Sequence, residues 1–205
     1  MKILLGGKAY LKLLPAPNKV KVVNHHRAMA IDEAPVFISR LRLHDGVAAL
    51  ALEFLILCAA RSGEVRGARW SEIDMDGRLW TVPRSRMKAG KEHRVPLNPQ
   101  AIEILSIIQK SPETDLIFVA PKGGELSDMT LTAVMRRMKG DAVPHGFRST
   151  FRDWVGERTS YPRELAEQAL AHAIENKVEA AYRRGDALDK RRVLMDDWGN
   201  FLTND

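Results

Sequence analysis

The segment His145-Gly-Phe-Arg148 is the first part of the sequence whose residue types could do chemistry. It places an imidazole and a guanidinium three residues apart, after Pro144 and at the start of an apolar run that we expect to be helical. Residues at positions i and i+3 share one face of a helix. Basic groups at a helix N-terminus suit an anion, most naturally a phosphate. Because the pattern H-x-x-R arises by chance in many proteins, its weight depends on the residues around it.

Further residues of matching chemistry stand in separate parts of the chain. Arg61 follows a long apolar segment, and Lys88 lies in a basic stretch that runs from Arg86 to Leu97. His172 follows Leu170-Ala171, and Tyr182 stands ten residues later. Arginine, lysine, histidine and tyrosine can bind a phosphate, transfer protons and attack phosphorus.

Each of these residues also has an ordinary structural interpretation when it is taken alone. Arg61 could bind carbonyl groups at a helix end, and Lys88 could be a solvated loop residue with Lys91 as a rival acid. His172 could be a core histidine at a helix end, and Tyr182 could be a buried amphipathic tyrosine.

In order and spacing, the set resembles the tyrosine recombinases, the phage-type integrases of prophages and genomic islands. Two segments are typical of them: RSGEVRGARWSEID at 61–74 and KVEAAY at 177–182. The resemblance covers about Glu33 to Leu202. The chain departs from the commonest family pattern, Thr-Gly-x-Arg, because Ala59-Ala60-Arg61 replaces a small polar residue and a glycine but no reactive group.

The resemblance implies an enzyme that cuts and rejoins DNA strands without a metal, ATP or other cofactor. Tyr182 would be the nucleophile and would form a 3′-phosphotyrosine with release of a 5′-hydroxyl, which keeps the bond energy for rejoining. Arg61 and Arg148 would stabilise the negative charge on the non-bridging oxygens.

The remaining polar residues of the set would move protons or position other groups. Lys88 would protonate the leaving 5′-oxygen. His145 would act as general base or phosphate ligand, and His172 as hydrogen-bond donor to the phosphate. Glu64 would orient the basic groups, although it could equally be a simple partner of a nearby arginine.

Other basic side chains are expected to contact the DNA backbone without reading its sequence. These are Arg66, Arg69, Arg84, Arg86, Lys91, Arg152, Arg183 and Arg184. Histidine and tryptophan side chains outside the set are interpreted as structural, namely His93, Trp70, Trp80 and Trp154.

The composition agrees with a polyanionic partner. The 205 residues include 32 Lys and Arg against 26 Asp and Glu, a net charge of +6, and basic surfaces attract phosphate backbones. The single cysteine, Cys58, favours a reducing compartment and is interpreted as a small buried apolar residue. With no run of about 18 apolar residues, no membrane span is expected. The resemblance adds a cytoplasmic, nucleoid-associated location.

Hydrophobic periodicity predicts a mainly α fold with a small antiparallel β-sheet (α+β), which the resemblance specifies as the tyrosine recombinase catalytic-domain fold. Helices are predicted at 34–43, 47–60, 65–68, 99–109, 128–138, 147–158, 163–171, 176–182 and 188–202. Strands at 79–82 and 94–97 form a hairpin whose tip is the basic loop 84–91, and 116–119 is a brief apolar element.

Residues 1–32 are predicted to be a basic leader or linker, and residues 33–205 the catalytic domain. The resemblance implies arm-binding and core-binding domains ahead of the catalytic one, so we expect a fragment that binds DNA weakly. The expected partner is double-stranded DNA at attachment sites, where the full-length enzyme would act as a tetramer with accessory DNA-bending proteins. We expect the segment after Tyr182, with Gly185 as a hinge, to fold back in cis when DNA is absent.

Two other interpretations remain open at the level of sequence. A type IB topoisomerase uses the same kinds of residues, although the surroundings of Gly63-Glu64 and the short chain favour the integrase. A non-catalytic DNA-binding accessory protein could keep the fold, but the intact set of reactive residues argues against it.

Overall fold

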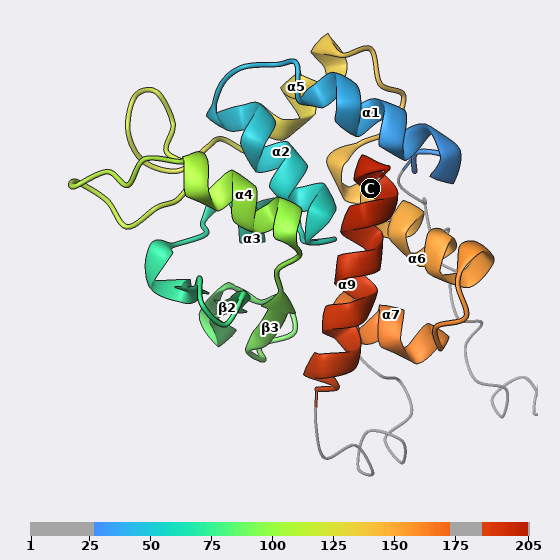
Figure 1. Cartoon of the computed structure of the whole chain (residues 1–205). Helices are drawn as coiled ribbons and strands as arrows, with labels where there is room; N and C mark the ends of the chain where they lie inside the picture. Colours follow the sequence, from blue (N-terminus) through green and yellow to red (C-terminus); the bar gives the residue numbers. More distant parts are fainter. Residues whose placement is uncertain (1–26, 173–185, 205) are drawn as a thin grey trace, which may run out of the picture.

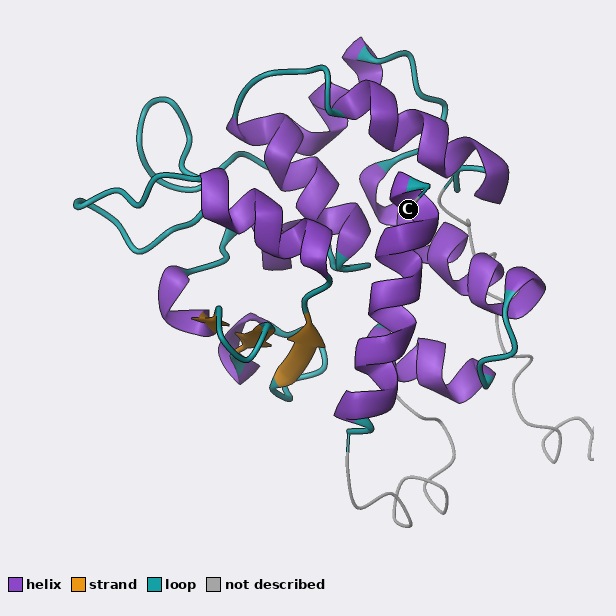
Figure 2. Cartoon of the chain, viewed as in Figure 1, coloured by secondary structure: helices purple, strands orange, loops and turns teal. Residues whose placement is uncertain are grey.

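Helices dominate the structure, a computed structural model that describes residues 27–172 and 186–204 (Figure 2). This confirms the predicted fold class, mainly α with a small antiparallel sheet. The predicted helix at 176–182 lies outside the described residues. The helices are α1 (Ala34–Leu41), α2 (Val47–Leu57), α3 (Ser62–Arg66), α4 (Pro99–Ile107), α5 (Thr130–Arg137), α6 (Phe147–Arg158), α7 (Arg163–Ala169) and α9 (Leu188–Thr203).

One small antiparallel sheet lies beside the helices, with the strand order β1 (Ile73–Asp74), β2 (Leu79–Val82) and β3 (His93–Pro96). The predicted hairpin is confirmed, and Trp80 of β2 pairs with Val95 of β3. Strand β1 was not predicted, because two residues are too few to show alternation. The apolar element at 116–119 forms isolated bridges and no strand.

Helix α2 is the centre of the core, as its sequence predicts. Eight of its eleven residues are buried, which is expected of a helix that is apolar on all sides. It packs against α1, α3, α4, α5 and α9. The chain then turns from α2 into α3 through Ala59-Ala60-Arg61, so the core helix fixes the start of the segment that carries Arg61.

Helix α9 crosses the molecule between α2 and α4 on one side and α6 and α7 on the other (Figure 1). Its Trp198 is fully buried. The Trp198 ring centroid lies 5.4 Å from that of Phe151 and 5.1 Å from that of Trp154. Trp198 Nε1 donates a hydrogen bond of 2.9 Å to the Ile56 carbonyl at the end of α2. In this structure α9 therefore packs in cis, against its own chain.

The buried amide of Asn98 joins three helices. Its Nδ2 donates to the carbonyl of Leu57 at 3.2 Å and to that of Met195 at 3.1 Å. Its Oδ1 accepts from the backbone N–H of Ala101 at 2.9 Å and so caps α4. Helices α2, α4 and α9 are thus fixed to one another at one side chain.

The described chain before Glu33 also contacts the domain. Thr150 Oγ1 donates to the Met29 carbonyl at 2.7 Å, and the Val143 N–H donates to the Arg27 carbonyl at 3.1 Å. Residues 27–32 therefore pack against α6 and the turn before it.

Two further features of the core agree with the sequence. Cys58 is buried, and burial raises the pKa of its thiol above the ordinary value, as expected of a small core residue. Within residues 27–172 and 186–204, no helix combines the length and the apolar composition needed to cross a membrane.

Two helical glycines give a matched test of this packing. A Cβ added at Gly199 would lie 2.4 Å from Gln100 Oε1 and 2.9 Å from Asn98 Cγ, whereas a Cβ at Gly156 meets nothing within 4 Å. We expect Gly199→Ala to lower the free energy of unfolding by about 1–3 kcal/mol through overpacking. Gly156→Ala should raise it by about 0.5–1 kcal/mol, because alanine is the better helix former. Urea denaturation measures both; equal stabilities for the two variants would contradict the α4–α9 packing.

Candidate active site

Arg61 stands at the N-terminus of α3 and is held by Glu64 one turn later. Glu64 Oε2 accepts from the Arg61 backbone N–H at 2.9 Å, and Oε1 accepts from Arg61 Nη1 at 2.7 Å. The Glu64 side chain is buried, so this pair is shielded from water. Glu64 thus satisfies an orphan donor of the helix and also orients the guanidinium. Glu64 thus pairs with an arginine and also orients it, so its geometry fits both interpretations that the sequence left open.

The turn before Arg61 explains the glycine of the common family pattern. Ala59 has a φ of 47°, in the left-handed region where an L-residue with a Cβ is strained by roughly 1–2 kcal/mol. Glycine would adopt this conformation without that strain. The turn directs the Ala59 carbonyl toward Arg148, which lies 89 residues further along the chain.

Arg148 is the buried centre of the site. Its Nη1 donates to the Ala59 carbonyl at 2.6 Å, and its Nη2 donates to the Leu170 carbonyl at 2.5 Å. The side chain is only 4% exposed. Burial, together with the charge of Arg61, lowers the pKa of Arg148 to about 10. The guanidinium therefore stays charged at neutral pH, in a shielded place where a charge acts strongly on its neighbours.

His172 is placed between Arg148 and Glu167. Its Nε2 lies 3.1 Å from Arg148 Nη2, and because a guanidinium only donates, Nε2 must be the acceptor. The proton of the neutral ring is then on Nδ1, which lies 2.5 Å from Glu167 Oε2. Glu167 thus fixes the tautomer and orientation of His172.

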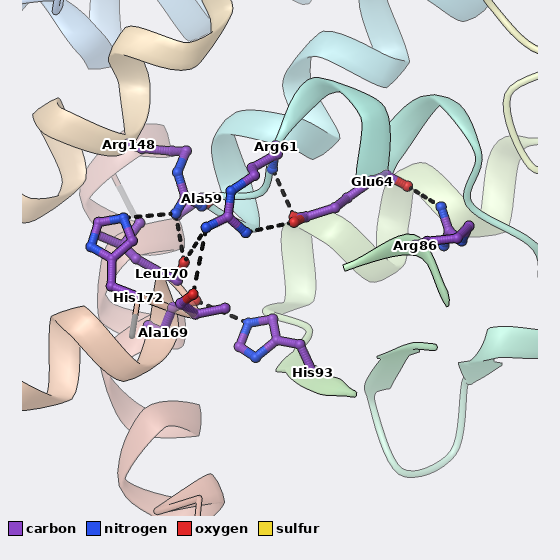
Figure 3. Close-up of polar contacts among 10 residues, drawn as sticks. Ala59, Arg61, Glu64, Arg86, His93, Arg148, Ala169, Leu170 and His172 are labelled. Atoms are coloured by element: carbon purple, nitrogen blue, oxygen red, sulfur yellow. Dashed lines mark hydrogen bonds and ion pairs between the residues drawn. The ribbon is translucent and has the colours of Figure 1, made fainter. Parts of the chain in front are cut away.

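The last carbonyls of α7 gather these groups in one place (Figure 3). The carbonyls of residues 169–171 lie where a helix end leaves acceptors without partners and carries partial negative charge. His93 Nε2 lies 3.1 Å from the first of them. Arg61 Nη2 approaches the second and third at 3.4 and 3.5 Å, and Arg148 binds the second.

His93, interpreted from the sequence as structural, contacts this cluster from β3. Burial lowers its pKa to about 4, with a smaller contribution from the charge of Arg191. Its ring is therefore neutral at pH 7, and Nε2 donates to the Ala169 carbonyl. The only sequence signal for this position was its place five residues after Lys88 in the predicted hairpin.

The other predicted catalytic residues lie in different surroundings. Lys88 is exposed in the turn that follows the short 3-10 helix Arg84–Arg86. His145 is exposed in the 3-10 turn Pro144–Gly146, whereas Arg148 of the same H-x-x-R motif is buried. Tyr182 and Arg183 lie outside the described residues.

The predicted DNA-backbone residues fall into two groups. Arg84, Lys91 and Arg152 are exposed. Arg86 instead donates to Glu72 through Nε and Nη2, at 3.1 and 2.5 Å, and its Nη1 donates to the Glu64 carbonyl at 2.8 Å. Its donors are engaged inside the chain, so the structure gives Arg86 a role in supporting α3.

The arrangement is suited to binding an anion. A guanidinium has five N–H donors, and Arg61 and Arg148 each keep some after the contacts above. In the described part of the chain, no group of His, Cys, Asp and Glu side chains could hold a metal ion. Arg61 and Arg148 bring positive charge to this place.

The fold and this cluster place the chain in a known class. The architecture is that of a tyrosine recombinase catalytic domain. The sequence model described as "Phage integrase family" matches residues 28–188, and the chain belongs to this family.

Curated relatives are similar over most of this chain. The integrase of Enterobacteria phage P4 is 32% identical over 200 residues, which cover 87% of this chain and 46% of the relative. The integrase of Shigella phage Sf6 is 29% identical over 212 residues, covering 97% and 54%. The chain thus spans about half the length of the curated relatives it matches.

Solved structures share the fold at lower identity. The integrase of mycobacterium phage Brujita has a TM-score of 0.63 at 18% identity, covering 91% of this chain and 62% of that one. A lambda integrase dimer bound to a COC′ core site, residues 75–356, has a TM-score of 0.56 at 21% identity, covering 81% and 62%.

The low pKa of His93 predicts a stability change on acidification. The folded pKa of about 4 lies below the ordinary value of 6.5, so the unfolded chain binds this proton first. The contribution is complete above pH 6.5 and is lost as the pH falls toward 4, at up to about 1.4 kcal/mol per pH unit. NMR titration of the histidine rings should show one that stays neutral to about pH 4, and His93→Gln should remove that signal. A titration midpoint for His93 near the ordinary pKa of 6.5 would contradict its burial against α7.

Proposed function

We propose that this chain is the catalytic domain of a site-specific DNA recombinase, which cuts and rejoins strands through a phosphotyrosine at Tyr182. One observation carries the proposal: Arg61 and Arg148, 87 positions apart in the sequence, converge with His172 at the end of α7. Tyr182 follows ten residues later, in the order that the family resemblance implies.

The chemical step is a transesterification. The Tyr182 oxygen attacks phosphorus, the bond from phosphorus to O5′ breaks, and a 3′-phosphotyrosine and a 5′-hydroxyl result. Lys88, exposed on the hairpin, would give the proton to O5′, and His145 would take the phenol proton. The reverse attack by a 5′-hydroxyl rejoins the strand without an external energy source.

The transition state carries extra negative charge on the non-bridging oxygens. Arg61 and Arg148 would bind these oxygens with fixed donors, which require no reorganisation at the moment of reaction. His172 Nε2 lies beside Arg148 Nη2, so the ring is placed where it could contact the same phosphate. Glu167, on the opposite ring nitrogen, would hold the ring in that orientation.

The partners follow from the chemistry and from the structural relatives. One similar structure is a lambda integrase tetramer bound to a Holliday junction, and we propose double-stranded DNA and a tetramer for the longer protein of which this chain matches about half. DNA-bending accessory proteins and DNA-binding domains ahead of residue 33 belong to the same proposal. Arg84, Lys91 and Arg152 would contact the DNA backbone.

A covalent adduct tests the enzyme against the non-catalytic binder. The chain is incubated with a library of duplexes, each nicked so that the cleaved 5′-hydroxyl fragment diffuses away and the phosphotyrosine accumulates. We expect a protein–DNA adduct that survives denaturation and whose recovered DNA shares a sequence. Tyr182→Phe should form none, because it lacks the phenol oxygen. An adduct of undiminished yield with Tyr182→Phe would exclude Tyr182 as nucleophile, and no adduct with the parent chain would contradict the proposal.

Arginine replacements test the charge stabilisation. Arg61→Lys and Arg148→Lys should each slow adduct formation by about 10²- to 10³-fold, the usual cost of one lost transition-state donor. Arg158→Lys, exposed at the end of α6 and paired with Asp32, is the matched control and should react within about twofold of the parent. Circular dichroism checks that each variant folds. Parent-like rates for Arg61→Lys and Arg148→Lys would contradict their assigned role.

A further inference from the structure

Arg191 is a buried charge that the proposed mechanism does not use. It lies in the first turn of α9 and is only 1% exposed. Its Nε donates to the Asp186 carbonyl at 2.7 Å, Nη2 to Asp186 Oδ2 at 3.0 Å, and Nη1 to the Arg94 carbonyl of β3 at 2.5 Å. The guanidinium thus holds one residue of the preceding chain against one strand of the hairpin.

Packing alone does not account for an arginine here. The other large buried residues of α9, including Leu194, Met195 and Trp198, are apolar and fill the core without loss of hydration. Burying a guanidinium carries a desolvation cost that an apolar residue of similar volume avoids. What an apolar side chain would lack is the set of directed bonds to Asp186 and Arg94.

Asp186 is the near end of the chain that carries Tyr182. Asp186 stands four positions after Tyr182, so their Cα atoms can be at most about 14 Å apart. His172, the last described residue on the other side, is ten residues from Tyr182 and allows about 36 Å. The place of Asp186 therefore restricts the reach of Tyr182 far more than that of His172 does.

Asp186 is also tied to the side of the site that carries Lys88. Arg94 Nη1 lies 3.5 Å from Asp186 Oδ2, and Arg94 directly follows His93, which contacts the end of α7. The charges of Arg191 and Arg148 both act on the His93 ring. The contact between Arg191 and Asp186 thus lies beside the cluster of catalytic candidates.

We propose that Arg191 is a positioning residue for the nucleophile. By clamping Asp186 to β3, it fixes the end of the Tyr182 segment and so sets the position from which the phenol reaches the phosphate. This inference rests on the proposed function, because it assigns Arg191 a role through Tyr182.

The first experiment measures adduct formation by the 205-residue chain on the nicked duplex recovered with the parent. Arg191→Met keeps an unbranched side chain in the core and removes the clamp. Measured well below the thermal midpoint of each variant, adduct formation should slow about tenfold or more while DNA binding stays close to the parent value. Arg192→Met is the matched control: Arg192 is the next residue of α9, but it donates to the carbonyls of Gly77 and Arg78 in the β1–β2 turn. It should react at the parent rate.

A changed leaving group distinguishes the nucleophile from the acid. A substrate with sulfur at the bridging 5′ position releases a thiolate, which leaves without needing a proton. This substrate should therefore restore the rate of adduct formation by Lys88→Ala and leave that of Arg191→Met slow. Restoration of Arg191→Met would show that the hairpin and its acid had been displaced, and would overturn the inference. A parent rate for Arg191→Met, or rates of both α9 variants that fall only with their thermal midpoints, would overturn it as well.

A distance measurement separates this inference from the proposed function. Spin labels are attached at Tyr182→Cys and Arg152→Cys, while Cys58 is buried and stays unlabelled. Arg191→Met should broaden the distribution of distances between the labels, and Arg192→Met should not. If the distribution stays unchanged, the clamp is refuted whatever the enzyme does. If it broadens while the parent chain forms no adduct, the clamp stands and the proposed function fails.

Discussion

The site depends on the charge of Arg148, which is buried in a place where water could not replace its partners. Its guanidinium binds the Ala59 carbonyl after α2 and the Leu170 carbonyl after α7, so one side chain on α6 connects three helices. Removing a buried partner of this kind leaves polar groups unpaired, which costs more than the bond itself contributes. The geometry of Arg61 and His172 follows from the same contacts, because both approach the α7 end that Arg148 holds.

The hydrophobic core supplies the rigidity that this polar cluster needs. Helix α2 is buried on all sides, and its last carbonyls are taken by Trp198 and Asn98. These bonds satisfy acceptors that a helix end leaves free, and they fix the turn in which Ala59 adopts its left-handed conformation. Since α9 follows Tyr182 in the sequence, the helix after the proposed nucleophile and the helix before Arg61 share one junction.

Buried ionic groups recur around this junction, and each has a defined set of partners. Glu64 holds Arg61, and Arg191 holds Asp186. Burial of such groups is costly unless their hydrogen bonds are directed and satisfied. Such directed partners keep an arginine in a fixed orientation, which the proposed binding of a phosphate requires.

The sequence by itself determined the fold class, most helix positions, the β2–β3 hairpin and the set of candidate residues. Apolar periodicity reports which face of a helix is buried, as it does for α6 and α9, whereas α2 was predicted as a core helix because it is apolar on all sides. The candidate set came from residue order, in which Arg61, Arg148 and His172 stand in separate but characteristic surroundings.

Only the tertiary structure decided which polar groups meet. Periodicity contains no information on contacts between residues far apart in the sequence, such as those of Arg148 and Arg61 with Leu170, which are 22 and 109 positions apart. For that reason the sequence did not show that His93 contacts the end of α7, that Arg191 binds Asp186 or that Arg86 binds Glu72. Whether a basic side chain faces solvent or a buried carboxylate depends on neighbours that folding brings together, and residue order alone does not show which residues those are.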